Sequence, residues 1–166
     1  GRQALLEDVG ELGCHELVAL LGGRKTELAA ALRVADQAAL EAHKIASAAD
    51  IPISLTLSDP AMVDNFKANY DQLLSIGVDL LFCNHDEARL LTGADSVEDC
   101  VLALKEIYKT FVITCGKAGS VAFDGQNLTT GTGVTTKAVD TTGAGDIFAG
   151  TFLHCLCLGL GFSEAN

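Results

Sequence analysis

Two hydrophobic periodicities alternate along the middle of the chain. Apolar residues over 25–49 recur at the 3.6-residue period of a helix, which predicts one helix over this range. Residues 51–57 then alternate at the two-residue period of a strand, and Pro60 follows. The next predicted elements are a helix over 62–74, a strand over 78–83, a short helix from Asn84 to Gly93, a helix opened by Ser96 and Asp99, and a strand over 111–114. Strands separated by helices are typical of a parallel sheet with crossover helices.

The pattern changes after residue 119. Close-set strands are predicted over 120–123, 127–130 and 134–139, with an Asp124-Gly125 turn joining the first two as a hairpin. A glycine-containing turn follows, and residues 147–158 are strongly apolar without proline, which predicts a buried helix. Helical spacing also occurs over 5–12, but residues 1–24 are otherwise hard to interpret. The chain is therefore predicted to be α/β, with three αβα layers, a mostly parallel central sheet and a β-hairpin segment.

Composition restricts the partners of this protein. A length of 166 residues suits one domain, and 49% apolar against 20% charged residues excludes general disorder. Eleven Lys and Arg against 22 Asp and Glu give a net charge of −11, which disfavours nucleic-acid backbones and anionic membranes. No apolar run reaches the ~18 residues of a membrane span. The expected partner is a small molecule, and main-chain amides would have to bind any anionic part of it.

The six cysteines are scattered and form no CxxC pair. Buried free thiols in a reducing cytoplasm are the favoured interpretation, and a zinc site at His154, Cys155 and Cys157 is disfavoured because neighbouring positions do not share a helix face. The chain has no starting Met and ends at Asn166 in what resembles the first turn of a helix. It is expected to be truncated at both ends.

Residues 140–146, DTTGAGD, carry the strongest chemical signal. Two glycines before an apolar helix let the main chain approach a ligand, and the first N–H groups of a helix form an anion site suited to phosphate. Asp146 is placed to accept a proton from an attacking hydroxyl. A tight turn at Gly143 and Gly145, with Asp146 as a helix-dipole acid, explains the same pattern. The standard phosphate motifs are missing, since no GxxxxGK[ST] occurs and Phe148 stands where GxGxxG needs a glycine.

The segment DTTGAGDIFAG, residues 140–150, closely resembles the C-terminal signature of the ribokinase-like (phosphofructokinase-B-type) carbohydrate and nucleoside kinases. The resemblance extends from about Leu28 to residue 166. It implies that Asp146 is the catalytic base, and that Asp140 with the Thr142 main chain helps to hold an activating monovalent cation such as K⁺. It also implies that three main-chain amides bind the transferring phosphoryl group, those of Gly143, Ala144 and Gly145.

Two further motifs fit the same family. Asn84 and Glu87 match its N-x-x-E motif, in which Asn approaches the nucleotide phosphates and Glu organises Mg²⁺ through water. The same pair is close to a helix capping box, which alone would explain it, and one pair can serve both roles. Residues 114–119 match the family's T-x-G-x-x-G turn, which lines the adenine-nucleotide site. The residues that match there are Thr114, Gly116 and Gly119. A plain hairpin turn remains the alternative.

The resemblance implies an ATP- and Mg²⁺-dependent kinase that phosphorylates a hydroxymethyl group of a sugar or nucleoside. Softer similarities over 54–60 and 78–84 suggest the bacterial adenosine-kinase-like subgroup. The alternatives are a vitamin-precursor kinase of the same fold and a non-catalytic nucleotide-binding fragment. A partial kinase domain is assigned to residues 25–166, and residues 1–24 form a poorly assignable segment. The acceptor-binding half of the family is not visible, so we expect the chain alone to be inactive and to self-associate.

Overall fold

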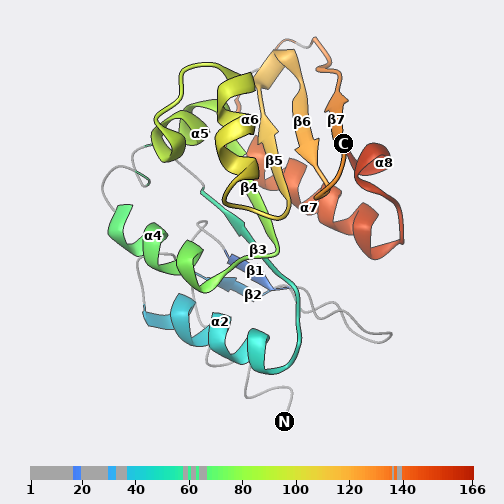
Figure 1. Cartoon of the computed structure of the whole chain (residues 1–166). Coiled ribbons are helices and arrows are strands. Elements are labelled where there is room, and N and C mark those ends of the chain that lie inside the picture. The colour runs from blue at the N-terminus through green and yellow to red at the C-terminus, as the bar shows by residue number, and fades with distance from the viewer. Residues whose placement is uncertain are drawn as a thin grey trace.

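A computed structural model gives the fold of the chain (Figure 1). It describes residues 17–19, 30–32, 37–57, 60, 63, 67–135, 137 and 140–166. The described strands form one mixed sheet in the order β2-β1-β3-β4-β5-β6-β7. The pairs β3–β4 and β4–β5 are parallel, and antiparallel pairs flank them on both sides. The strands are β1 (Leu17–Ala19), β2 (Ala30–Leu32), β3 (Ile53–Thr56), β4 (Leu80–Asn84), β5 (Phe111–Thr114), β6 (Ser120–Phe123) and β7 (Leu128–Gly131).

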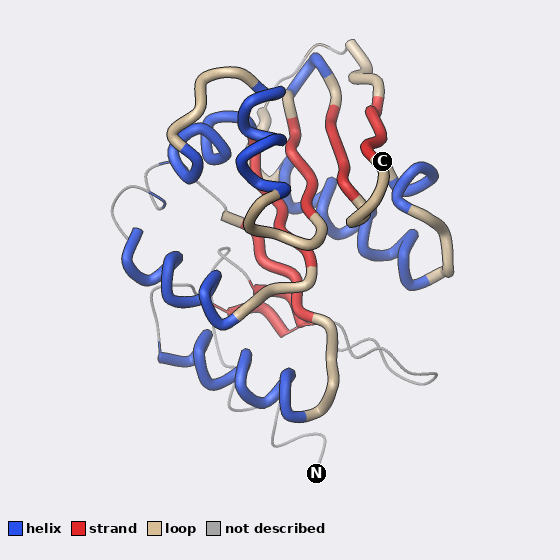
Figure 2. Tube along the Cα trace, in the orientation of Figure 1, coloured by secondary structure: helices blue, strands red, loops and turns tan. Residues whose placement is uncertain are grey.

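Helices cover both faces of this sheet, as Figures 1 and 2 show. Four of them lie on one face: α2 (Gln37–Ala48), α4 (Lys67–Ile76), α5 (His85–Thr92) and α6 (Val97–Lys105). The opposite face is covered by α7 (Ala144–Cys157) and by α8 (Phe162–Ala165). This arrangement confirms the predicted three-layer α/β fold. The described sheet is mixed rather than mostly parallel, because two of its strand pairs are parallel and four are antiparallel. None of the described helices is both long and apolar enough to cross a bilayer.

Strand β4 contributes side chains to two hydrophobic cores, one on each face of the sheet. Successive side chains of a strand point to opposite faces, so Leu81 and Cys83 join the core under α5 and α6, while Leu80 and Phe82 join the core under α7. In the second core, the Phe152 ring of α7 stands edge-on to Phe82, with ring centroids 5.6 Å apart. A strand that is apolar on both faces must be central and covered on both sides, and β4 is.

The predicted elements differ from the structure at two places. Residues 30–32 form β2, paired with β1, and the helix begins only at Gln37. The alanine-rich run before the helix suits a strand as well as a helical stripe, and pairing with β1 decides between them. Residues 132–135 and 137 carry no strand, although one was predicted over 134–139; at Gly133 the main chain contacts the 114–119 turn instead of pairing as a strand. Residues 136, 138 and 139, and the predicted helix over 5–12, lie outside the described residues.

The helix predicted as buried over 147–158 is α7, which buries only Ala149, Phe152 and Leu153 and exposes its other face, so burial on all sides was wrong. The remaining predicted elements agree more closely with the structure. The strand over 111–114 and the first hairpin strand, over 120–123, have the predicted bounds. The Asp124-Gly125 turn joins β6 to β7, with the Asp124 N–H donating to Asn127 O at 3.2 Å. Among the five described cysteines, Cys83 and Cys100 are buried as predicted, whereas Cys115 and Cys155 are half-buried and Cys157 is exposed; none forms a disulfide with another described cysteine.

Candidate active site

One row of paired residues crosses the sheet at the carboxyl ends of β4 and β5. Asn84 pairs with Thr114, Thr114 with Ser120, and Ser120 with Gly131. Ligands of open α/β sheets bind outside the carboxyl ends of the parallel strands. The structure therefore brings the N-x-x-E motif and the T-x-G-x-x-G turn together at this edge.

Asn84 and Glu87 form a complete capping box at the start of α5. The Glu87 N–H donates to Asn84 Oδ1 at 2.9 Å, and the Asn84 N–H donates to Glu87 Oε2 at 2.8 Å. A third hydrogen bond runs from Asn84 Nδ2 to Glu87 Oε1, also at 2.8 Å. Both carboxylate oxygens thus accept within the cap, and Glu87 is only 2% exposed. The structural role predicted for this pair is present in full.

The cap also affects Cys83, the residue before it. Burial and the neighbouring Glu87 charge raise the pKa of the Cys83 thiol well above its usual value, with smaller contributions from Cys100 and Cys115. The thiol is therefore protonated at neutral pH and unsuited to nucleophilic chemistry. Cys83 acts as a core residue of this edge.

Residues 114–119 form a tight turn stabilised by its own main chain. The Cys115 N–H donates to Gly119 O at 2.7 Å, and the 3₁₀ turn η1 (Gly116–Ala118) closes with the Gly119 N–H on Gly116 O at 3.0 Å. Gly116 and Gly119 have φ of 54° and 100°, which side-chain-bearing residues rarely adopt. The glycines of the T-x-G-x-x-G motif are thus required by the backbone of this turn. Burial raises the pKa of the Cys115 thiol, which is therefore protonated at neutral pH.

The 140–146 loop leads into α7 at the same end of the molecule. Helix α7 begins behind the sheet, towards the edge where β4 and β5 end (Figures 1 and 2). The Thr142 N–H donates to Asp140 Oδ1 at 2.8 Å, and this hydrogen bond, followed by one from the Thr142 side chain, lowers the pKa of Asp140. Asp140 is therefore an ionised carboxylate at neutral pH. An ionised oxygen ligand fits the monovalent-cation role that the resemblance implies.

The amides of this loop are only partly available for an anion. Ala144 N–H donates to Thr141 O at 3.1 Å, whereas no main-chain carbonyl of the described residues accepts from the N–H groups of Gly143 and Gly145. Gly143 has φ of 75°, and a Cβ built on it would lie 3.9 Å from Asp146 Oδ2. The Asp146 carboxylate is exposed and lies beside this amide cluster.

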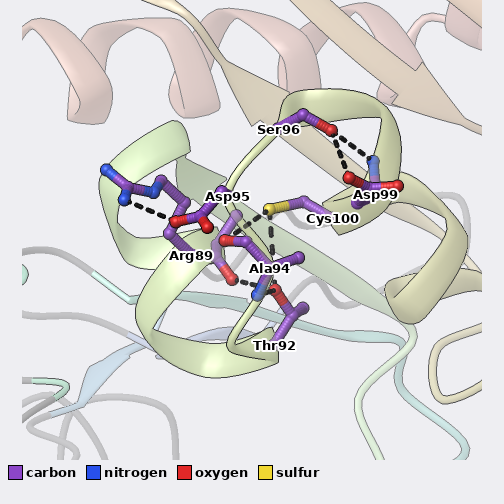
Figure 3. Close-up of polar contacts among 8 residues, drawn as sticks. Arg89, Thr92, Ala94, Asp95, Ser96, Asp99 and Cys100 are labelled. Carbon is purple, nitrogen blue, oxygen red and sulfur yellow. Dashed lines mark hydrogen bonds and ion pairs between the residues drawn. The ribbon is translucent and has the colours of Figure 1, made fainter.

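The far end of α5 is fixed by a junction with α6 (Figure 3). The Thr92 hydroxyl lies 2.7 Å from Ala88 O and 3.5 Å from Cys100 Sγ, and it accepts from the Ala94 N–H at 3.2 Å. Arg89 and Asp95 form an exposed ion pair at 2.9 Å on the same turn. These contacts hold the far end of α5, and the capping box of Asn84 and Glu87 holds its start.

Sequence reasoning missed the segment that supports the 114–119 turn. Gly133 approaches this turn so closely that it has no room for a side chain, and the Gly131 carbonyl oxygen fills the space beside Gly119. A side chain at Gly131 itself would overlap Asn166 O and Ser120 Oγ. The only signal in the sequence was the spacing Gly131-x-Gly133 after a predicted strand. Ser120 was also missed. It donates to Asn166 Oδ1 at 2.7 Å and joins α8 to β6.

Comparison with known proteins agrees with these features. The sequence model of the pfkB family of carbohydrate kinases matches residues 2–165, so the similarity begins earlier than Leu28. A ribokinase from Lactococcus lactis is 40% identical over 68 residues, which are 39% of this chain and 23% of that protein. The crystal structure of adenosine kinase from Sinorhizobium meliloti matches with a TM-score of 0.71 and 32% identity, over 77% of this chain and 40% of that one. A putative ribokinase II from E. coli in complex with ATP and Mg²⁺ matches with a TM-score of 0.66 and 25% identity, over 77% and 42% of the two chains.

The chain thus spans less than half the length of each of these three proteins. The family model nevertheless covers nearly the whole chain. We conclude that this chain belongs to the pfkB family of carbohydrate kinases.

Proposed function

We propose that this chain is the nucleotide-binding part of an ATP-dependent kinase that phosphorylates a hydroxymethyl group of a sugar or nucleoside. The observation that carries the proposal is the pairing of Asn84 with Thr114 at the carboxyl ends of two parallel strands, in a member of the pfkB family. Asn84 and the Thr114–Gly119 turn would bind the nucleotide from this edge. We also propose a cytoplasmic location, since the buried Cys83 and Cys100 are in no disulfide, as is usual in a reducing compartment.

Glu87 and Asp140 are the residues that fit metal ions. Mg²⁺ prefers oxygen ligands and usually keeps several waters. In our proposal the Glu87 carboxylate, whose oxygens accept from Asn84 within the cap, would also accept from a Mg²⁺-bound water. Asp140 and the Thr142 main chain would hold K⁺. When bound, Mg²⁺ neutralises charge on the nucleotide phosphates.

The chemical step needs a base beside an anion site. In our proposal, the Asp146 carboxylate takes the proton of the acceptor hydroxyl while the hydroxyl oxygen bonds to the γ-phosphorus. The bond from that phosphorus to the bridging oxygen breaks, and ADP leaves. The amides of Gly143 and Gly145 stabilise the developing negative charge, and Ala144 joins them when its N–H shifts from Thr141 O.

A single substitution tests the central role. Asp146→Asn would be examined in a full-length kinase in which this chain replaces the equivalent segment of a family member. We expect turnover to fall by about 10²–10⁴-fold, the usual contribution of a general base, with ATP affinity retained. The change removes the base without altering the size of the side chain.

The control for this experiment is Asp95→Asn, at an exposed carboxylate paired only with Arg89 on the α5–α6 junction. It should leave turnover unchanged. Normal turnover in the Asp146→Asn protein would remove this residue from the mechanism. Loss of ATP binding in both proteins would point to a folding defect of the hybrid.

A further inference from the structure

The main chain of the Thr114–Gly119 turn is in close contact with the main chain of residues 131–133, at the end of β7. A Cβ added to Gly119 would overlap the Gly131 carbonyl oxygen and lie 2.8 Å from Gly133 N. A Cβ added to Gly133 would overlap the Lys117 carbonyl oxygen and lie 2.8 Å from Gly119 N. Real Cβ atoms essentially never approach so closely, so glycines are required on both sides of this contact.

The requirement at Gly133 is one of space alone. Its φ lies outside the left-handed region, unlike those of Gly116 and Gly119, so its backbone conformation suits any residue. The atoms that a methyl group would meet belong to the main chain of Lys117 and Gly119, which cannot rotate aside as a side chain could. A side chain at 133 must therefore displace the turn itself.

Gly133 also lies between the two parts of the candidate site. In sequence it precedes the 140–146 loop, and its main chain contacts the turn that follows β5. We infer that Gly133 is a positioning residue, whose close contact sets the shape of the Thr114–Gly119 turn and so the affinity of the nucleotide site. This inference rests on the proposed nucleotide role of that turn.

The test is Gly133→Ala in the 166-residue chain, with Gly150→Ala as the matched control. A Cβ on Gly150, within α7, meets no atom within 4 Å, and its φ is also ordinary. Two-dimensional NMR would follow the main-chain amides with and without ATP and Mg²⁺. In Gly133→Ala, we expect the amides of Gly116 and Gly119 to shift before nucleotide is added, and the Kd for ATP to rise about tenfold, because overpacking against a backbone forces it to move.

The outcomes separate this inference from the proposed function. If the unmodified chain binds no ATP while the Gly116 and Gly119 amides still shift in Gly133→Ala, the proposed function fails and the structural part of the inference stands. If Gly133→Ala is folded and its turn amides and ATP affinity match those of Gly150→Ala, the inference is overturned.

A second measurement covers the case in which Gly133→Ala does not fold. Hydrogen exchange on the unmodified chain should show that ATP protects residues 114–119 and 131–135 together, while the Asp124-Gly125 turn at the opposite end of β6 and β7 stays unchanged. Protection of 114–119 without 131–135 would contradict the inference.

Discussion

At the scale of single residues, the Glu87 carboxylate stands out because it is almost fully enclosed and yet completely hydrogen-bonded. Its two oxygens accept from the main-chain N–H and the side-chain Nδ2 of Asn84. A buried charge of this kind is tolerated only where each oxygen has a donor. The proposed metal role uses the same carboxylate, so one buried group would serve both the cap and the Mg²⁺-bound water.

Gln is normally acceptable in a capping box, but the third hydrogen bond, from Asn84 Nδ2, makes Glu87→Gln disruptive here. Gln can accept from the Asn84 N–H, but its own NH₂ group would face Asn84 Nδ2, donor against donor. Asn84 cannot flip its amide without losing the bond from the Glu87 N–H. We expect the free energy of unfolding to fall by about 1–3 kcal/mol, the cost of leaving a buried polar group unsatisfied.

Urea denaturation measures this loss, with Glu98→Gln as the control. Glu98 is an exposed first-turn acid of α6, and its substitution should change stability by less than about 0.5 kcal/mol. A Glu87→Gln protein as stable as the control would contradict the enclosed cap. Titration of ATP binding with Mg²⁺ then tests the metal role separately, and a steeply raised Mg²⁺ requirement would support it.

Asp140 makes a second prediction at this scale, on pH. Its pKa is lowered by the Thr142 N–H, so the folded loop favours the ionised carboxylate. A lowered pKa contributes stability above the unfolded pKa, and this contribution is lost as the pH falls through the lowered folded value. We expect the Asp140 carboxyl and the Thr142 amide to titrate together by NMR, below the ordinary range of Asp. Titration of Asp140 at an ordinary value would show that the loop is open.

At the scale of elements, local sequence signals predicted the starts of two helices correctly. They failed where the pairing of two strands decides whether a segment is a strand or a helix. Asn84 and Ser96 both precede an acidic residue three positions later, and both cap the predicted helices. Residues 30–32 show the opposite case, because an apolar stripe without caps does not distinguish a helix from a strand that pairs with β1. Caps involve neighbours in sequence, whereas strand pairing does not.

The end of α5 provides a test of one such local signal. Gly93 ends the helix with φ of 74°, and a Cβ there would meet no atom within 4 Å. Gly93→Ala should therefore cost only the strain of a left-handed alanine, about 1–2 kcal/mol. Gly150→Ala, in a helix interior with equal space, should instead stabilise the chain by roughly 0.5–1 kcal/mol. Thermal unfolding of the two variants measures both effects, and equal melting temperatures would contradict the left-handed helix end.

At the scale of the whole molecule, the layers were predictable and the assembly of the site was only partly so. Alternating helices and strands imply the three layers, and the glycine motifs identify the loops. The contact of Gly133 with the Thr114–Gly119 turn joins positions far apart in sequence, so no local pattern reveals it.

The last prediction concerns catalysis by the 166-residue chain alone. An acceptor hydroxyl must lie about 3 Å from both the base and the phosphoryl site for the reaction to proceed. In the described structure Asp146 and its loop are exposed, and exposed charges interact weakly through water. Val134 and Ile147, on either side of the loop, are 84% and 72% exposed, so apolar surface also faces solvent around the site. We expect ADP release at background level with ATP, Mg²⁺, K⁺ and a panel of sugars and nucleosides, and concentration-dependent association in sedimentation experiments. Robust acceptor-dependent ADP release by a monomer would contradict this prediction, and would mean that the chain holds and shields an acceptor by itself.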